Sequence, residues 1–251
     1  MPFFCSVPFG LTATEMTAWL HEGGGLELWR EAYAPHGLLP FPAGNTGVQM
    51  AGWFRAPVES LQSLQGLKIR LPGLGGEVMA RLGATPVNLP GDAIFAALKD
   101  GTLDAAEWMG PSNDLAFGLP RAAKYGYAPG WQEPGATMEA IVNIDAWRRL
   151  PPDLQAIVET CCHALNDAML AEYTARNAQA LDALVREHGA DLRQLPDDVL
   201  VALRAAAEIV LDEAAGSDPL ARRALDSMRA FRSRARGWAA LSDEAYAAAR
   251  G

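Results

Sequence analysis

The spacing of hydrophobic residues predicts alternating short strands and helices in the middle of the chain. The expected strands and helices follow in the order 67–71, 76–82, 85–89, 92–100 and 103–109. Ile94, Phe95 and Leu98 share one face of the second helix, and Gly101 follows it as a C-cap. Strands and helices that alternate with short connections are typical of an α/β layer with parallel strands.

The segments on either side are less regular. The first part of the chain predicts two short helices within 11–36, separated by Gly23–Gly25 and capped at the start by Thr12 or Thr14. An extended segment over 38–54 and a short helical turn over 59–65 follow. A further extended segment is expected over 131–143.

From Pro151 onward the pattern is helical. Hydrophobic residues recur at helical spacing, and neither proline nor glycine interrupts the chain between Pro152 and Gly189. This predicts a helix of roughly 36 residues, about 54 Å long. A helix of that length must run along more than one structural unit or pair with another chain. A strand over 191–195 and helices over 197–215 and 219–238 complete the prediction.

Composition narrows the function. The chain has 251 residues, half of them hydrophobic, which is enough for one or two domains. Its formal net charge of -9 and the lack of a basic run argue against nucleic acid as the main partner. No apolar run of membrane-spanning length occurs, and the first ten residues do not resemble an export signal. The three cysteines fit neither a disulfide framework nor a metal cage.

The stretch KIRLPGLGGE, residues 68–77, looks at first like a nucleotide-binding loop. The dinucleotide fingerprint requires a third glycine where Val78 stands, and the P-loop requires a Lys-Ser/Thr pair where Glu77 and Val78 stand. Both nucleotide-binding interpretations therefore fail. The simplest interpretation that remains is a tight strand-to-helix turn.

Arg70 is the informative residue of this stretch. It stands near the carboxyl end of a predicted strand, where ligands bind in open α/β sheets. A guanidinium there can hold a carboxylate through two parallel hydrogen bonds, and the following helix N-terminus also favours an anion. The competing interpretation is an ordinary surface arginine.

A second group of candidates offers oxygen atoms. Glu107 follows an apolar strand, Glu133 lies in a loop with Pro134 and Gly135, and Gln49 lies in the extended stretch that begins at Asn45. Oxygen donors from Gln, Glu and a backbone carbonyl suit a hard cation such as Na⁺ or Ca²⁺ better than zinc. Both glutamates could instead be solvated surface residues. No nucleophile elbow and no recognisable catalytic set of side chains accompanies them.

Residues 64–108, LQGLKIRLPGLGGEVMARLGATPVNLPGDAIFAALKDGTLDAAEW, together with the long helix after Leu150-Pro-Pro-Asp153, resemble a known family. This family comprises the extracytoplasmic solute-binding subunits (DctP type) of tripartite ATP-independent periplasmic (TRAP) transporters. The resemblance covers essentially the whole chain. It implies an α/β, two-lobe periplasmic-binding-protein fold (class II-like) with a long helix along both lobes.

Three further stretches, GNTGVQMAGWF, EWMGPSNDLAFGL and YAPGWQEPG, resemble the branch of this family that binds 2-oxo or 2-hydroxy monocarboxylates such as pyruvate or lactate through a bound cation. The resemblance implies that Arg70 holds the ligand carboxylate, with Asn45, Gln49 and Glu133 as further ligand-binding residues. It also implies that Gln49, Glu107, the Trp108 carbonyl and Glu133 ligate Na⁺ or Ca²⁺.

The resemblance also implies a division of the chain. Residues 1–42 and 108–132 are expected to be a remnant of lobe one, 43–107 and 133–150 to form lobe two with the hinge strands, and 151–251 to form the spanning helix and the C-terminal helices. Crossings between the lobes are expected near 41–54, 104–110 and 129–140. Relatives begin with an export signal and a first half-lobe, so we expect this chain to lack that half-lobe.

The expected function is capture of a small carboxylate in the periplasm and its delivery to the TRAP membrane permease, without chemistry. Some relatives dimerise, so a homodimer through the C-terminal helices is a further expectation. Two alternatives stay open at this point. One is a metal-dependent enzyme on 2-oxo acids, in which the same oxygen cluster polarises a carbonyl. The other is a truncated fragment that binds nothing.

Overall fold

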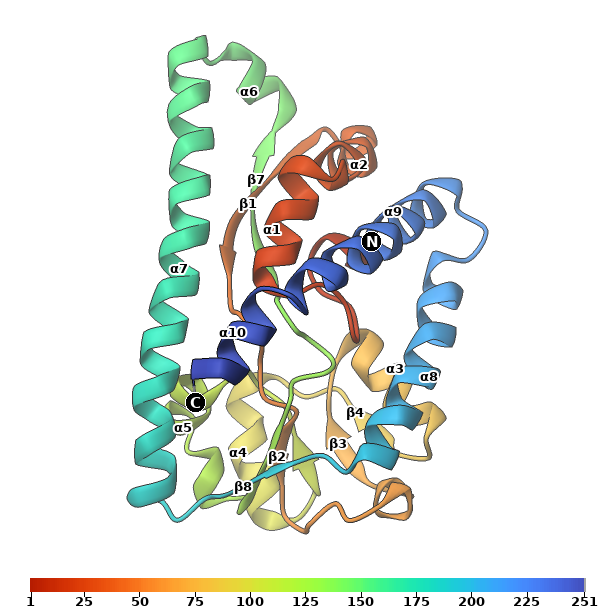
Figure 1. The fold of residues 1–251 in the computed structure, drawn as a ribbon, viewed down its shortest axis with the longest axis vertical. Helices are drawn as coiled ribbons and strands as arrows, with labels where there is room; N and C mark the ends of the chain where they lie inside the picture. The colour runs from red at the N-terminus through yellow and green to blue at the C-terminus, as the bar shows by residue number, and fades with distance from the viewer. Residues whose placement is uncertain (251) are drawn as a thin grey trace.

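The fold is that of a computed structural model that describes residues 1–250. Its lower part in Figure 1 is built on a six-stranded sheet with strand order β4-β3-β5-β2-β6-β8. The strands are β2 (Gly52–Phe54), β3 (Lys68–Arg70), β4 (Thr85–Val87), β5 (Ala105–Ala106), β6 (Tyr125–Ala128) and β8 (Asp191–Gln194). The expected parallel layer is confirmed, because β3 pairs in parallel with both β4 and β5. β2 lies between β5 and β6 and pairs antiparallel with both.

Helices cover both faces of this sheet. They are α3 (Gly73–Arg81), α4 (Gly91–Asp100), α5 (Pro111–Ala116) and α8 (Asp197–Ala215). One face packs Ile69 and Phe54 against α3 and α8. The other packs Trp53 and Ala106 against Ile94 and Leu98 of α4. Burial on both faces explains why the central strands β2 and β5 consist of buried, uncharged residues throughout.

The upper part of the molecule contains a two-stranded antiparallel sheet, β1 (Leu38–Asn45) with β7 (Thr137–Asn143). Beside it lie α1 (Ala13–Glu22), α2 (Gly25–Tyr33) and α6 (Ile144–Arg149). Thr12 caps α1 in a capping box with Glu15, so one of the two expected caps is confirmed. The core of this part is aromatic, because Phe4 stacks on both Trp19 and Trp29.

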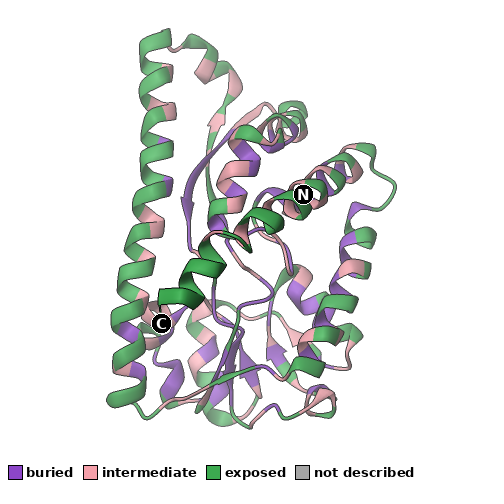
Figure 2. Ribbon diagram, in the orientation of Figure 1, coloured by how far each residue is buried: buried purple, intermediate pink, exposed green. Residues whose placement is uncertain are grey.

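The long helix is confirmed as α7 (Pro152–Arg186), 35 residues, which runs the full height of the molecule in Figure 1. It packs on β1 above and on α5 below. Several of the hydrophobic residues that recur along it at helical spacing are exposed, among them Ile157, Leu165 and Leu181, and Figure 2 shows most of this helix in contact with solvent. None of the helices described over residues 1–250 combines the length and apolarity needed to cross a membrane.

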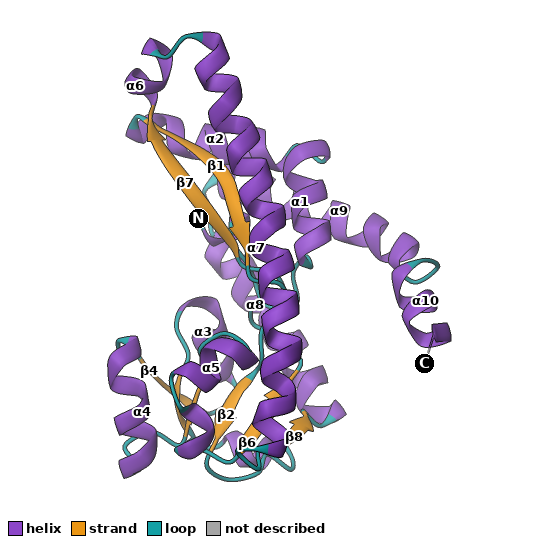
Figure 3. Ribbon diagram, turned by 90° about the vertical axis from the view of Figure 1, so that its left-hand side faces the viewer, coloured by secondary structure: helices purple, strands orange, loops and turns teal. Residues whose placement is uncertain are grey.

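Two further helices follow α8. They are α9 (Pro219–Ala239), which packs on α1 and α2, and α10 (Asp243–Arg250). Figure 3 shows the end of α9 and α10 extending away from the rest of the molecule. Four short 3₁₀ turns complete the structure, at Pro2–Phe4, Ala34–His36, Leu61–Leu64 and Leu119–Arg121.

Two segments link the sheets, 46–51 between β1 and β2 and 129–136 between β6 and β7. We call them linker 1 and linker 2. They agree with two of the three expected crossings. The third expected crossing, at 104–110, is wrong, because this segment contains β5 of the six-stranded sheet and leads into α5, which packs on the same sheet. Residues 125–128, from a segment expected in lobe one, also pair within this sheet as β6.

Candidate functional site

The two linkers lie against each other. The amide of Gln49 donates to the Glu133 carbonyl at 3.3 Å, and the amide of Thr46 donates to the Ala136 carbonyl at 3.1 Å. Their backbones approach so closely that a Cβ on Gly130 would collide with the Gln49 carbonyl. Gln49 and Glu133, two of the residues predicted for the site, are therefore brought together by the chain itself.

The side chains of this pair are also joined. The Gln49 amide Nε2 donates to Oε2 of Glu133 at 2.7 Å. Burial raises the pKa of Glu133, although the hydrogen bond from Gln49 and the charge of Arg70 oppose the shift.

Arg70 ends β3 and its side chain is largely buried, with 12% exposed. Its Nη1 donates to the Glu107 carbonyl at 2.9 Å and to the Glu107 carboxylate at 3.4 Å, and its Nε donates to the Leu89 carbonyl at 3.4 Å. The guanidinium also lies 5.2 Å from the ring centroid of Trp108. Arg70, Glu107 and Trp108 thus form one contiguous group at the carboxyl ends of β3 and β5.

Glu107 is deeply buried, with 2% of the residue exposed. Burial raises its pKa well above the usual range for a glutamate, and the nearby carboxylate of Glu133 raises it further, while Arg70 opposes the shift. A carboxyl group in such surroundings needs a proton, a cation or hydrogen-bond donors. The interpretation of Glu107 as a solvated surface residue is wrong.

Three oxygen atoms of neighbouring side chains are buried without a hydrogen-bond partner among the described residues: Gln49 Oε1, Glu107 Oε1 and Gln132 Oε1. Buried acceptors are normally satisfied, so three in one cluster require an explanation. Oxygen acceptors that lack donors are the environment that Na⁺ and Ca²⁺ select. The donor set present here therefore fits a hard cation.

Gln132 was not predicted from the sequence. It is 2% exposed, and its Nε2 donates to the Met50 carbonyl at 2.8 Å. Because a carbonyl can only accept, the amide nitrogen must face Met50, which directs Oε1 to the other side of the amide. The signal in the sequence was its position beside Glu133, a residue that was singled out.

Asn45 has a different role in this structure. Its Nδ2 donates to the Gly135 carbonyl at 3.3 Å and to the Thr137 hydroxyl at 3.2 Å, and its Oδ1 accepts from the Gly47 amide at 2.9 Å. These bonds fasten the start of linker 1 to the end of linker 2. Asn45 is therefore adjacent to the other predicted residues, with both ends of its amide engaged by protein groups.

Behind Trp108, a buried aspartate holds the loop that carries it. Asp114 in α5 accepts hydrogen bonds from the Trp53 indole at 2.8 Å and from the Met109 amide at 3.2 Å. Burial raises the pKa of Asp114 to about 7 despite these two donors. The loop between β5 and α5, which carries Trp108, is thereby fixed to both α5 and β2.

A cavity of about 240 Å³ adjoins this cluster. Gln132 and Glu133 of linker 2 line it, together with Pro2, Cys5, Ser6 and Pro8 from the N-terminal segment and residues 72–75 at the start of α3. The first turn of α3 has no side-chain cap. Its free amides favour an anion at this end of the cavity.

No group of three or more His, Cys, Asp or Glu side chains within residues 1–250 is arranged to hold a metal ion. The predicted cation ligands include a glutamine side chain and a backbone carbonyl, which are donors of a different kind.

Comparison with known proteins assigns the chain to a family. Residues 3–218 match the family model described as bacterial extracellular solute-binding protein, family 7 (DctP). The chain belongs to this family. The resemblance to DctP-type solute-binding subunits is therefore confirmed. The chain is a solute-binding protein rather than the metal-dependent enzyme of the first alternative.

Relatives of this family-7 chain carry more specific descriptions. It is 41% identical over 246 residues to a monocarboxylate 2-oxoacid-binding periplasmic protein of Nostoc sp.. The aligned region covers 98% of this chain and 67% of the Nostoc protein. A TRAP periplasmic solute-binding protein from Pseudoalteromonas atlantica, with bound sodium and pyruvate, is 42% identical with a TM-score of 0.91. The match covers 97% of this chain and 74% of that one.

A TRAP transporter solute-binding protein from Bordetella bronchiseptica superimposes with a TM-score of 0.94 at 37% identity, over 99% of this chain and 74% of that one. It is described as a mixed-occupancy dimer with copurified calcium and picolinate in one site and an apo second site. The likeness of these structures confirms the two-lobe α/β fold with a long helix.

Proposed function

We propose that this family-7 protein captures a small 2-oxo or 2-hydroxy monocarboxylate, such as pyruvate or lactate, together with a bridging Na⁺ or Ca²⁺. The observation that carries the proposal is the cluster of buried, partnerless oxygens beside Arg70. The descriptions of the Nostoc and Pseudoalteromonas relatives support the ligand class, and those of the Pseudoalteromonas and Bordetella proteins support the cation.

In this proposal, Gln49, Glu107, the Trp108 carbonyl and Glu133 hold the cation. When bound, the cation supplies the positive charge that lets a carboxylate and a 2-oxygen approach two buried glutamates. Arg70 holds the ligand carboxylate, with the stacked Trp108 ring keeping the guanidinium in place. Gln132 adds an acceptor oxygen to the same wall.

Capture is followed by delivery to the membrane subunits of a TRAP transporter, in the periplasm. The family description and the periplasmic relatives support this location and partner. Closure around the solute has to be driven by contacts that differ between the open and closed states. The linkers are suited to this, because each joins the two sheets and each contributes residues to the cluster.

A homodimer is the second part of the partner proposal. Trp238, Leu241 and Tyr246 are 72%, 80% and 67% exposed, and they lie where α9 and α10 extend from the body (Figure 3). Large apolar side chains that are exposed together mark an interaction surface. The dimer of the Bordetella relative supports a second copy of the chain as the partner.

The deciding measurement is calorimetry of the purified chain with pyruvate and lactate, in buffers with and without Na⁺ or Ca²⁺. We expect cation-dependent binding. Arg70→Ala removes the carboxylate contact and should weaken binding by at least about 30-fold, since truncating one partner of a buried hydrogen-bonded charge pair costs about 2–5 kcal/mol. Glu107→Gln should mainly raise the cation concentration that is needed.

Arg148→Ala is the matched control, because Arg148 is exposed and pairs only with Asp145 across one helical turn. Its affinity should equal that of the wild type. If Arg70→Ala binds as tightly as this control, the assignment of the carboxylate contact is wrong. Absence of any heat from the folded wild-type chain would favour the alternative that the chain binds nothing.

A further inference from the structure

Phe9 has an unusual backbone conformation close to the site. Its φ angle is 53°, in the left-handed region that residues other than glycine rarely adopt. Such a conformation persists only where the surroundings hold it. Within residues 1–250, Phe9 is the one non-glycine residue with positive φ.

Two contacts bind Phe9 to linker 2. Its amide donates to the Trp131 carbonyl at 2.7 Å. Its ring stacks on the Trp131 indole with a centroid distance of 5.8 Å and an interplanar angle of 27°. Trp131 directly precedes Gln132 and Glu133, so Phe9 holds the backbone from which two residues of the candidate site project.

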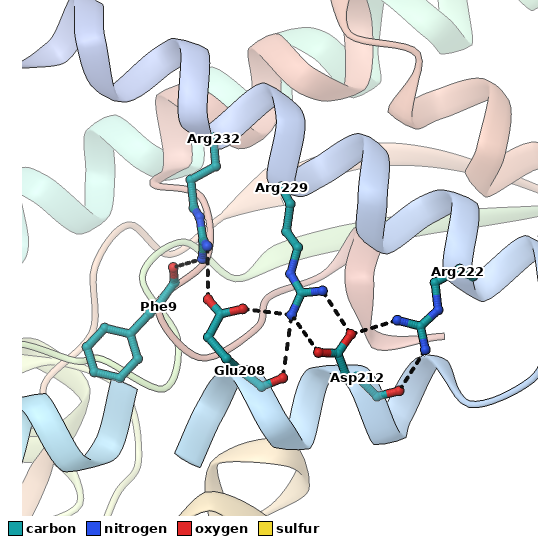
Figure 4. Close-up of polar contacts among 6 residues, drawn as sticks. All are labelled: Phe9, Glu208, Asp212, Arg222, Arg229 and Arg232. Carbon is teal, nitrogen blue, oxygen red and sulfur yellow. Dashed lines mark hydrogen bonds and ion pairs between the residues drawn. The ribbon is translucent and has the colours of Figure 1, made fainter. Parts of the chain in front are cut away.

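On its other side, Phe9 is held by the C-terminal helices. Nη1 of Arg232 in α9 donates to the Phe9 carbonyl at 2.7 Å, and Nη2 of Arg232 donates to Glu208 of α8 at 3.0 Å (Figure 4). The Arg204 guanidinium lies 5.2 Å from the centroid of the Phe9 ring. Arg232 therefore connects α8 and α9 to linker 2 through a single residue.

The ion-pair network in Figure 4 fixes Arg232 in turn. Arg229 bonds to Glu208 at 2.7 Å and to Asp212 at 2.9 Å, and Arg222 bonds to Asp212 at 2.6 Å. Arg222 reaches Asp212 and the Gly216 carbonyl, at the end of α8 away from Phe9. Within this network, Arg232 contacts Phe9, whereas Arg222 contacts only groups at the end of α8 and the turn after it.

We propose that Arg232 is a positioning residue for the solute site, which it serves by holding Phe9 in the left-handed conformation that fixes Trp131, Gln132 and Glu133. This inference rests on the proposed function. Side chains that bind a ligand are effective when the segment carrying them is fixed before the ligand arrives. The Arg232–Phe9–Trp131 chain supplies that fixation from a helix outside the site.

The test compares Arg232→Ala, Arg232→Lys and Arg222→Ala by calorimetry with pyruvate in a buffer containing both Na⁺ and Ca²⁺. Arg232→Ala should weaken pyruvate binding about tenfold. Arg232→Lys should recover part of the loss, because an ammonium group can still donate to the Phe9 carbonyl. Arg222→Ala removes ion pairs from the same network and should stay within about twofold of the wild type. Equal losses for Arg232→Ala and Arg222→Ala would overturn the proposal.

Hydrogen exchange provides a readout that does not require binding. Exchange of the Phe9 amide, which donates to Trp131, should accelerate in Arg232→Ala and keep its wild-type rate in Arg222→Ala. If wild-type protein gives no heat with pyruvate, the proposed function fails, and the exchange rates still decide whether Arg232 holds this segment. Should Arg232→Ala fold poorly, Arg232→Met takes its place, because methionine keeps an aliphatic side chain and has no donor for the Phe9 carbonyl. Unchanged exchange at Phe9 in the folded Arg232→Ala or Arg232→Met protein would overturn the positioning role.

Discussion

At the scale of single residues, buried acids dominate the site. Glu107, Asp114 and Glu133 all have raised pKa values, with burial as the first cause in each case. Asp114 is the one that lies outside the proposed cation ligands. It supports the loop of Trp108 through the Met109 amide and is satisfied by two hydrogen-bond donors. Its titration can therefore be followed through the stability of the protein.

Asp114→Asn should change how stability depends on pH. In the wild type, the pKa of Asp114 rises from 3.8 in the unfolded chain to about 7 in the folded protein. The folded state then holds a proton that the unfolded state has released, so the free energy of unfolding falls as pH rises from about 4 to about 7. Asparagine does not titrate, and removing this contribution should flatten the profile by up to roughly 4 kcal/mol.

Urea unfolding at several pH values between 4 and 8 measures this difference. Asp145→Asn is the control, since Asp145 is exposed on α6 and pairs only with Arg148. The prediction fails if the Asp114→Asn and wild-type profiles run parallel across the whole range.

The sequence identified most of the clustered residues but could not show how they meet. Arg70 and Glu107 were singled out by their places at strand ends, which the parallel pairing of β3 and β5 turns into proximity. Gln132 was missed because nothing in its local sequence marks burial. Its environment depends on the Met50 carbonyl, 82 positions away in the chain.

At the scale of secondary structure, the long helices and most of the short strands were predicted, since β3, β4, β5 and β8 all lie within the expected strand segments. The 197–215 helix has the expected ends, and the long helix over 152–186 is nearly as expected. β6 escaped prediction because Tyr125–Ala128 contains glycine and has no alternating pattern, and its place is set by β2 and β8 on either side. The short helix α6 was also missed, although Asn143 caps it with bonds of 3.0 Å to two amides.

The close contact between linker 1 and linker 2 can be tested by a substitution at Gly130. Gly130→Ala should destabilise the protein by about 1–3 kcal/mol or more, because the added methyl group meets the rigid Gln49 backbone rather than a flexible side chain. The same displacement should weaken solute binding, since it moves Gln49 away from Glu133.

Thermal unfolding and calorimetry check both effects. Gly237→Ala in α9 is the control, because a Cβ there has no neighbour within 4 Å and alanine favours a helix. If Gly130→Ala unfolds at the temperature of the Gly237→Ala protein, the linkers are not in the close contact that the structure describes.

At the scale of the whole molecule, the prediction concerns the proposed dimer, which would form through the exposed hydrophobic residues of the C-terminal helices. Replacing Trp238 and Leu241 together by aspartate should convert the proposed dimer into monomers, since two charges would be placed in an apolar interface. Light scattering after size-exclusion chromatography gives the mass directly.

Val201→Asp is the comparison for this double variant, because Val201 is also an exposed hydrophobic residue, 63% accessible, but lies on α8. It should leave the mass of the assembly unchanged. A monomeric wild-type chain at all concentrations tested would refute the dimer, while leaving the solute site unaffected.

The linkers have a consequence for how this molecule evolves. Gln49 and Glu133 are at once part of the connection between the two sheets and part of the proposed cation site. Under the proposed function, a substitution at either position that suits a new solute would also change how the two parts close. Solute specificity and the rate of closure would then change together. If the proposed solute occupies the adjoining cavity, residues that line it outside the linkers, such as Ser6 and Leu74, could change without this coupling.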